Sequence, residues 1–239
     1  MSTQRTVWAQ DRQICYTLEE KRVKNINLRV RPDGSVYVSA PYGADRARID
    51  AFVCSKAGLI LAAQQAQSAP ARAPLQYQTG DEIQLLGRTI ALRVIQSARD
   101  EAQLTGGTLL LRLRHPEDPS ARMRLAERFI DGQCQAVFAS ALDAAFPPFA
   151  SLGFDKPLLR IRDMKTRWGS CMPQKGVITI NRRLIQALPG CIRMVVTHEL
   201  CHLMHPNHGA GFYDLLNRCM PDWSQYKAVL RQNAVQWLR

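Results

Sequence analysis

VVTHELCHLMHPNHGAGF, residues Val195–Phe212, holds four of the five histidines of the chain within eleven positions. It contains the pattern HExxH, formed by His198, Glu199 and His202, in a segment with helical spacing. Residues four apart lie one turn apart on the same helix face, so the two imidazoles can bind one metal ion. Glu199 can then reach a water on that ion and accept its proton. The stretch therefore predicts a helix that carries a metal site.

An ordinary buried helix with two hydrogen-bonded histidines is the alternative interpretation. The chain has 5 histidines and 7 glutamates in 239 residues, so roughly 0.003 matches to HExxH are expected by chance. The ordinary helix also leaves Glu199 on a core-facing surface, where a charge is costly unless it is paired or bound to a metal. Both points favour the metal site.

A catalytic zinc needs a third protein ligand and an open fourth position. His208 follows His202 after five residues, and Pro206 is expected to end the helix near His205 and let the chain turn back. His205 is the competing ligand, on roughly the same face as His198 but two turns along. We favour His208 as the ligand and assign His205 to the neighbourhood of the substrate or of the metal ligands.

Basic residues gather upstream of this helix. Residues 151–183 hold eight lysines or arginines against two aspartates, which supplies half of the net charge of +12, whereas residues 81–135 balance at eight of each sign. A local basic cluster attracts an anionic partner or substrate. Solvated arginines on an ordinary surface explain the charge equally well.

Three residues near the metal helix are candidates for contacts to substrate or to a developing oxyanion. Lys165 and Arg167 could stabilise an oxyanion or hold a phosphate, although Arg167 could equally pair with a carboxylate of the helix. Tyr213 could donate a hydrogen bond to a reacting carbonyl, or could simply be packed. Trp168 is expected in the core and Gly169 in a turn.

The composition is that of a globular protein, with 46% hydrophobic and 22% charged residues. No apolar run approaches the ~20 residues needed to span a bilayer, and the first residues lack the apolar region of a signal peptide. Seven scattered cysteines without a CxxC pair indicate reduced thiols. We therefore expect a cytoplasmic protein without a membrane partner.

The N-terminal half alternates apolar and polar residues. NINLRV and SVYVSA predict strands joined by the turn Arg31-Pro32-Asp33-Gly34. Residues 45–67 have the spacing of one helix, and residues 68–74 (SAPARAP) form a linker or loop. EIQLLG is expected to pair with TIALRVI, and TIALRVI with TLLLRLR across the turn at Gly106-Gly107.

A boundary is expected at residues 115–120, after which the spacing becomes helical. The predicted elements beyond it are a helix over 121–146 that Pro147-Pro148 ends, strands at 158–162 and 177–181, the histidine helix from Pro189, and a last helix from Pro221 to near Leu238.

HELCHLMHPNHGAGFYDLL, together with RWGSC (Arg167–Cys171) and ITINRRLI (Ile178–Ile185), resembles the YgjP-like metal-dependent hydrolases, also called YgjP-like metallopeptidases. NINLRVRPDGSVYVSAP and YQTGDEIQLLGRTIALRV extend the resemblance to nearly the full chain. One departure is Gly209, which stands where the family usually has a serine after the histidine.

The sequence pattern predicts an α+β fold that begins with a β-rich N-terminal module carrying one helix (1–117). The resemblance implies that residues 118–239 form a compact zincin-like metallohydrolase domain with the HExxH helix, related to the SprT-type proteases. It implies His198, His202 and His208 as ligands of one Zn²⁺ per chain, or of another divalent metal, and Glu199 as the catalytic base.

Three functions compete. The first is a zinc metallopeptidase acting on a peptide or protein. The second is a metal-dependent nucleoside triphosphate pyrophosphatase with a UTP-like substrate, in which Lys165, Arg167 and Arg160 or Arg162 bind phosphates. The basic cluster favours the second, and the three-histidine site and the family resemblance favour the first. The third is a nucleic-acid-associated binding protein, whose charge fits but for which no known nucleic-acid-binding signature is present.

Overall fold

The computed structural model describes residues 2–31, 33–68 and 75–237. The structure is mixed α+β, as the sequence predicts, and divides into two compact units, Met1–Ala73 and Pro74–Arg239, called unit 1 and unit 2. The division falls in the predicted linker at 68–74, which lies outside the described residues except for Ser68. In the described ranges, no helix has the length and apolar character needed to cross a bilayer.

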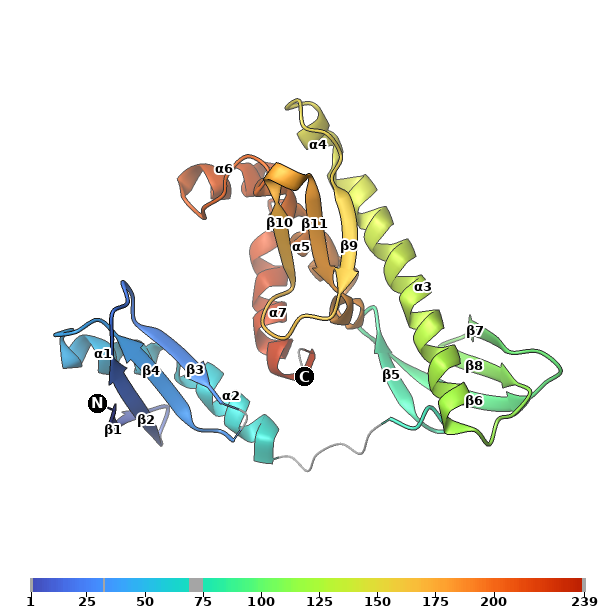
Figure 1. Cartoon of the computed structure of the whole chain (residues 1–239), viewed down its shortest axis with the longest axis horizontal. Helices are drawn as coiled ribbons and strands as arrows, with labels where there is room; N and C mark the ends of the chain where they lie inside the picture. Colours follow the sequence, from blue (N-terminus) through green and yellow to red (C-terminus); the bar gives the residue numbers. More distant parts are fainter. Residues whose placement is uncertain (1, 32, 69–74, 238–239) are drawn as a thin grey trace. The chain divides into compact units, whose positions relative to one another are not determined.

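Unit 1 consists of a four-stranded sheet and two helices (Figure 1). The strands in sheet order are β1 (Ser2–Ala9), β2 (Arg12–Glu20), β4 (Val36–Ala40) and β3 (Asn27–Val30), and only the β2–β4 pair is parallel. Alternate residues of β2, Ile14, Tyr16 and Leu18, are buried against apolar residues of the helices. The predicted strands are confirmed, while Pro32 of the predicted turn lies outside the described residues.

The single helix predicted over 45–67 is wrong. The structure has two helices, α1 (Arg46–Ser55) and α2 (Ala57–Ser68), separated at Lys56. The Ser55 hydroxyl donates to the Phe52 carbonyl at 2.7 Å, and the Lys56 N–H donates to the Val53 carbonyl at 3.0 Å. Because these bonds reach back three residues, they tighten the turn and interrupt the regular helical pattern.

Unit 2 begins with a second four-stranded sheet in the order β5 (Glu82–Leu85), β6 (Arg88–Gln96), β8 (Thr108–Leu113) and β7 (Glu101–Thr105). TIALRVI and TLLLRLR do pair, as β6 and β8, but the pair is parallel. The turn at Gly106-Gly107 joins β8 to β7, a strand that sequence reasoning missed. β7 is mostly exposed and therefore lacks the alternating pattern that would reveal it.

The predicted helix over 121–146 is confirmed as α3 (Pro119–Ala145). Its start is defined by Asp118, whose carboxylate accepts a hydrogen bond from the Ser120 N–H at 2.8 Å. The short helix α4 (Pro147–Ala150) follows directly. α3 packs against the β5–β8 sheet. It also packs against the second sheet of unit 2 and against the helix that carries His198, both described below (Figure 1).

A three-stranded sheet lies beside the histidine helix, in the order β10 (Gly169–Met172), β11 (Val177–Asn181) and β9 (Leu158–Arg162). β11 is buried at all five residues, parallel to β9 and antiparallel to β10. The 3-10 helices η1 (Pro173–Lys175) and η2 (Arg182–Gln186) precede and follow β11. The edge strand β10 was not predicted, because four residues with a leading glycine carry little periodic signal.

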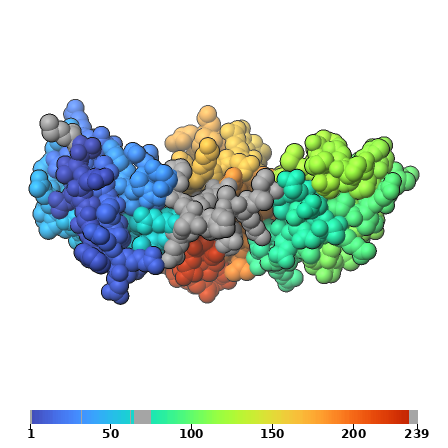
Figure 2. Space-filling view, turned by 90° about the horizontal axis from the view of Figure 1, so that it is seen from below, coloured from blue at the N-terminus to red at the C-terminus, as the bar shows by residue number. Residues whose placement is uncertain are grey.

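Three helices complete unit 2: α5 (Pro189–Cys201), α6 (Ala210–Cys219) and α7 (Trp223–Trp237). Residues from both sheets and from these helices join one core, in which Phe138, Phe149 and Phe212 are fully buried. The green part (β5–β8 and most of α3) and the orange and red part adjoin in both views (Figures 1 and 2).

The predicted domain boundary at 117/118 lies inside unit 2, between β8 and α3, which pack against each other. The guanidinium of Arg122 on α3 donates to the carbonyls of Gln76 and Pro116, at 3.2 and 2.6 Å. The turn between β5 and β6 is also attached to η2, because Leu86 N–H donates to the Ile185 carbonyl at 2.7 Å. The β5–β8 sheet is thus part of the histidine-bearing unit, and the structure divides the chain at 73/74 instead.

Candidate metal centre

Helix α5 places the first two histidines on one face. Pro189 occupies its first turn, where a missing N–H costs little. The helix ends at Cys201, earlier than the predicted end near His205, and His202 is its C-cap. The N–H of His202 donates to the Glu199 carbonyl at 3.2 Å, so a tightened helical turn continues through His202. His198 and His202 therefore remain one turn apart, as the HExxH spacing predicts.

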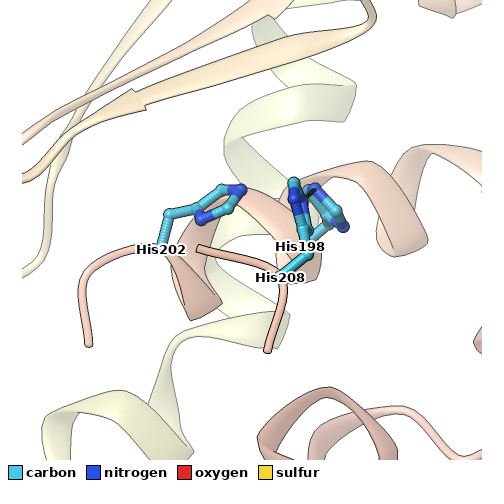
Figure 3. Close-up of side chains that lie close together, drawn as sticks. All are labelled: His198, His202 and His208. Atoms are coloured by element: carbon cyan, nitrogen blue, oxygen red, sulfur yellow. Dashed lines mark hydrogen bonds between the residues drawn. The ribbon is translucent and has the colours of Figure 1, made fainter. Parts of the chain in front are cut away.

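The third histidine comes from the loop between α5 and α6. Potential ligand atoms of His198, His202 and His208 all lie within 4.8 Å of one another. Figure 3 shows the three rings close together, with His198 on the helix, His202 at its C-terminal end and His208 on the loop that follows. Nε2 of His208 lies 3.0 Å from Nε2 of His198. In the described part of the chain, this is the group of three potential ligands that converges on one point.

His205 contributes a backbone atom to this arrangement. Nδ1 of His202 lies 2.9 Å from the carbonyl oxygen of His205. Because a carbonyl can only accept, the proton of neutral His202 resides on Nδ1, which leaves the Nε2 lone pair free for a metal. The His205 side chain packs against Gly211, where a Cβ would lie 2.9 Å from Cε1 of the ring. His205 is thus outside the converging triad and orients one of its members.

Phe212 forms the floor of the triad. Its side chain is fully buried, and its ring centroid lies 4.7–4.9 Å from the centroids of the three imidazoles. An apolar ring below the histidines restricts their rotation and excludes water from that side.

The electrostatics of the histidines suit metal binding. Burial, with the neighbouring His202 and His208 as further causes, lowers the pKa of His198 to about 3. Burial also lowers the pKa of His208. Both imidazoles are therefore neutral at physiological pH, and neutral imidazole is the form that binds zinc. Three imidazole nitrogens that converge from α5 and from the loop after it fit a zinc site with an open fourth position.

Glu199 lies beside the triad in a nearly buried position, with 6% of its surface exposed. Burial raises the pKa of its carboxyl to about 8, and the charge of Arg167 acts in the opposite direction. A carboxylate of that basicity can accept a proton from water near neutral pH. Gly169 of β10 lies directly against it, since a Cβ there would be 2.5 Å from Oε1 of Glu199. Gly169 is therefore a strand residue with a close neighbour, and the turn predicted for it is wrong.

Asn181 fastens the loop that leads to Gly169. Its side chain is fully buried, and its amide nitrogen donates to the carbonyls of Met164 and Arg167, each at 2.8 Å. The Asn181 N–H also donates to the Trp168 carbonyl at 2.8 Å. This single residue at the end of β11 therefore fixes the position of the Arg167 backbone near Glu199.

Two adjoining cavities open at the site. The first, of about 390 Å³, is lined by Arg167, Gly169, Ser170, Cys171, Pro173, His198, Glu199, His202, Pro206 and His208. The second, of about 330 Å³, is lined by Arg167, Trp168, Gly169, Met194, Val195, His198, Glu199, Lys227, Leu230 and Arg231. Arg167, Gly169, His198 and Glu199 border both cavities, so the two adjoin at the Glu199 carboxylate.

The residues predicted to contact the substrate differ in their position relative to the cavities and the histidines. Arg167 borders both cavities, whereas Lys165 is exposed and borders neither. The Tyr213 ring lies 6.4 Å from that of His208, between centroids, and is stacked on Trp223 at 5.6 Å. Trp168 is half-buried against the core, as expected.

Sequence reasoning missed the roles of Gly169, Asn181 and Phe212, and the cations of α7. RWGSC and ITIN were noticed as motifs, but contacts between residues 14 to 30 positions apart leave no periodic signal. Phe212 had a local signal, since it follows His208 by four residues at the start of a helix.

A model of the YgjP-like metallopeptidase domain matches residues 24–233. The comparison with curated proteins finds no match. The matched region includes the three histidines, Glu199, Gly169 and Asn181, together with all strands from β3 onward. It covers most of the chain, and the chain therefore belongs to the YgjP-like family, as a protein with that family's metallopeptidase domain.

Proposed function

We propose that this protein is a zinc-dependent metallopeptidase that acts in the cytoplasm. One observation carries the proposal: the ring nitrogens of His198, His202 and His208 converge beside the buried carboxylate of Glu199, in a recess large enough for a substrate. The family supports a metal-dependent hydrolase of this kind.

The three histidines would hold one Zn²⁺, although another divalent metal could take its place. When bound, such an ion polarises a carbonyl oxygen and lowers the pKa of a coordinated water to about 7. The tautomer set on His202 by the His205 carbonyl keeps a lone pair available to the ion.

Glu199 moves the protons of the reaction. Its carboxylate accepts a proton from the attacking water and then delivers it to the nitrogen of the leaving amine, so the residue ends the cycle as it began. Gly169 allows this carboxylate to lie at the border of both cavities. The guanidinium of Arg167, exposed in the same recess, can stabilise negative charge on the carbonyl oxygen.

The edge strand β10 favours a peptide over other substrates. Among the described strands it pairs with β11 alone, and four residues from Gly169 to Pro173 border the first cavity. An edge strand can pair with an extended peptide through backbone hydrogen bonds. Such pairing would lay a peptide along the recess beside Glu199.

The nucleoside triphosphate pyrophosphatase is the second candidate. Three cations, Arg167, Lys227 and Arg231, border the second cavity and could bind phosphates. Lys165 stays exposed outside both cavities, and Arg160 and Arg162 lie on exposed positions of β9. The phosphate contacts expected from the basic cluster therefore reduce to Arg167, with the α7 cations as additional groups.

Zinc-loaded full-length protein tests the two functions when it is incubated in parallel with unfolded casein and with UTP. The proposal predicts new peptide termini by mass spectrometry and no phosphate or pyrophosphate release. Pyrophosphate release from UTP without cleavage of casein or of any other peptide would overturn it and establish the second candidate.

A further inference from the structure

The second cavity has an apolar floor. Met194, Val195 and Leu230, from α5 and α7, are buried, and Trp168 is half-buried beside them. Its volume of about 330 Å³ falls within the range of about 300–1,000 Å³ typical of ligand sites. Because Glu199 and His198 also line this cavity, a group seated on its floor would lie next to the bond cleaved by the proposed peptidase.

The rim of the same cavity is basic. Arg167, Lys227 and Arg231 border it with exposed side chains, and Glu199 is the one carboxylate in its lining. In the described ranges none of the three cations forms an ion pair with a carboxylate. Their charge is therefore available to a ligand.

Lys227 is held in place by aromatic rings. Its Nζ lies 5.0 Å from the centroid of the Trp223 ring and 5.8 Å from that of Tyr213. A stacked pair, Tyr213 on Trp223, thus presents a cation at the mouth of the recess.

We propose that this second cavity is a specificity subsite of the peptidase, which receives an apolar side chain beside the scissile bond while Lys227 and Arg231 bind a carboxylate on the neighbouring residue. This inference rests on the proposed peptidase function. An apolar floor with a cationic rim complements an apolar residue followed by a negative charge. The carboxylate can belong to an acidic side chain or to the end of a peptide chain, and both present the same group.

Matched peptides test the subsite. One series places leucine at each position next to the cleaved bond and varies its neighbour among glutamate, glutamine and lysine; a second compares a free with an amidated C-terminus. For the wild type, kcat/KM for the carboxylate peptide should exceed that for the neutral one by roughly three- to tenfold, the effect of one or two partly exposed ion pairs. A higher kcat/KM with glutamate than with glutamine identifies an acidic side chain as the source of the carboxylate. A higher kcat/KM with the free than with the amidated C-terminus identifies the end of the peptide chain.

Charge reversal separates recognition from folding. Lys227→Glu combined with Arg231→Glu should invert the preference, so that the lysine peptide becomes the better substrate. Because the ratio is measured within one variant, a general loss of activity cancels. Arg128→Glu, an exposed reversal on α3 outside both cavities, should leave the ratio unchanged. The ratio of the Kd values of the glutamate and lysine peptides gives the same preference for binding alone. It is measured by fluorescence anisotropy of labelled peptides on Glu199→Gln protein.

The outcomes are distinct. Peptide cleavage with equal rates for glutamate and lysine neighbours, unchanged by the double reversal, would refute the subsite and leave the peptidase intact. A binding preference for carboxylate peptides without any cleavage would support the subsite and refute the peptidase. UTP cleavage that the double reversal abolishes, with no peptide bound or cleaved, would refute both.

Discussion

Gly169 and Glu199 are in such close contact that a Cβ at position 169 would lie 2.5 Å from Oε1 and 2.7 Å from Cγ of the glutamate. Real Cβ atoms do not approach other heavy atoms so closely, so any side chain at 169 must displace the Glu199 carboxylate or β10. The edge strand β10 and the histidine helix α5 are thus in close contact at the carboxylate that we propose transfers the proton.

Gly169→Ala should therefore lower kcat by at least about tenfold, because a small misplacement of a catalytic group is costly. Metal content should stay unchanged, since the histidines are untouched. Gly132→Ala is the matched control: Gly132 is inside α3 with open space around its Cα, and alanine there should stabilise the protein by roughly 0.5–1 kcal/mol. Full activity of Gly169→Ala would show that Glu199 does not need its observed position.

Asn181→Ala should destabilise unit 2 and loosen the loop before β10. The buried amide donates to two carbonyls at 2.8 Å, and leaving such acceptors unpaired costs about 1–3 kcal/mol in the free energy of unfolding. Urea unfolding measures the loss as a lower transition midpoint. Asn27→Ala, at an exposed position of β3, should change the midpoint little. An equal effect of both substitutions would contradict the fastening role of Asn181.

His208 and His205 should respond differently to alanine. His208→Ala removes a ring nitrogen of the triad, and metal affinity should fall by more than the roughly 10–100-fold typical of groups that only support a ligand. His205→Ala keeps the carbonyl that orients His202 and should retain most of the affinity. Titration against a zinc chelator of known affinity gives both values. If His205→Ala lowers the zinc affinity more than His208→Ala does, the third ligand has been misassigned.

Unit 1 should lose stability in acid through Asp50. The hydrogen bond from Arg5, at 2.7 Å, is the main cause that holds the pKa of Asp50 below its ordinary value of 3.8, and Tyr16 donates to the same carboxylate. A lowered folded-state pKa contributes stability above pH ~4 that is lost as the pH falls through the folded value. At pH values below ~4, the thermal unfolding midpoint of the full chain should therefore decrease as the pH is lowered. This decrease should be less steep in Asp50→Asn. Asp11→Asn, in the exposed β1–β2 turn, should follow the wild type.

Local patterns predicted much of this molecule. The HExxH spacing placed His198 and His202 one turn apart, and the turn expected at Pro206 favoured His208 as the third residue, which the structure brings to the same point. Sequence patterns revealed β3 and β4 of unit 1 and both β9 and β11 of unit 2. These signals succeed because helix and strand periodicity place the buried residues at fixed intervals along the chain.

The features that the sequence did not predict depend on contacts between residues far apart in the chain. The parallel pairing of β6 with β8 needs β7 as a connection, and β7 is too exposed to show a pattern. The division at 73/74 follows from the packing of α3 on the β5–β8 sheet, which composition does not report. Lys165 lies two residues before RWGSC in the sequence, yet of the two lysines only Lys227 borders a cavity, because α7 packs against α5.

The central claim is that Glu199 transfers protons at a metal held by three histidines. The most direct measurement compares Glu199→Gln with the wild type in two quantities, zinc per chain and the rate of peptide cleavage. We expect about one zinc per chain in both proteins and a loss of at least about 100-fold in the cleavage rate of the variant. Cleavage at the wild-type rate by a zinc-loaded Glu199→Gln protein would contradict it.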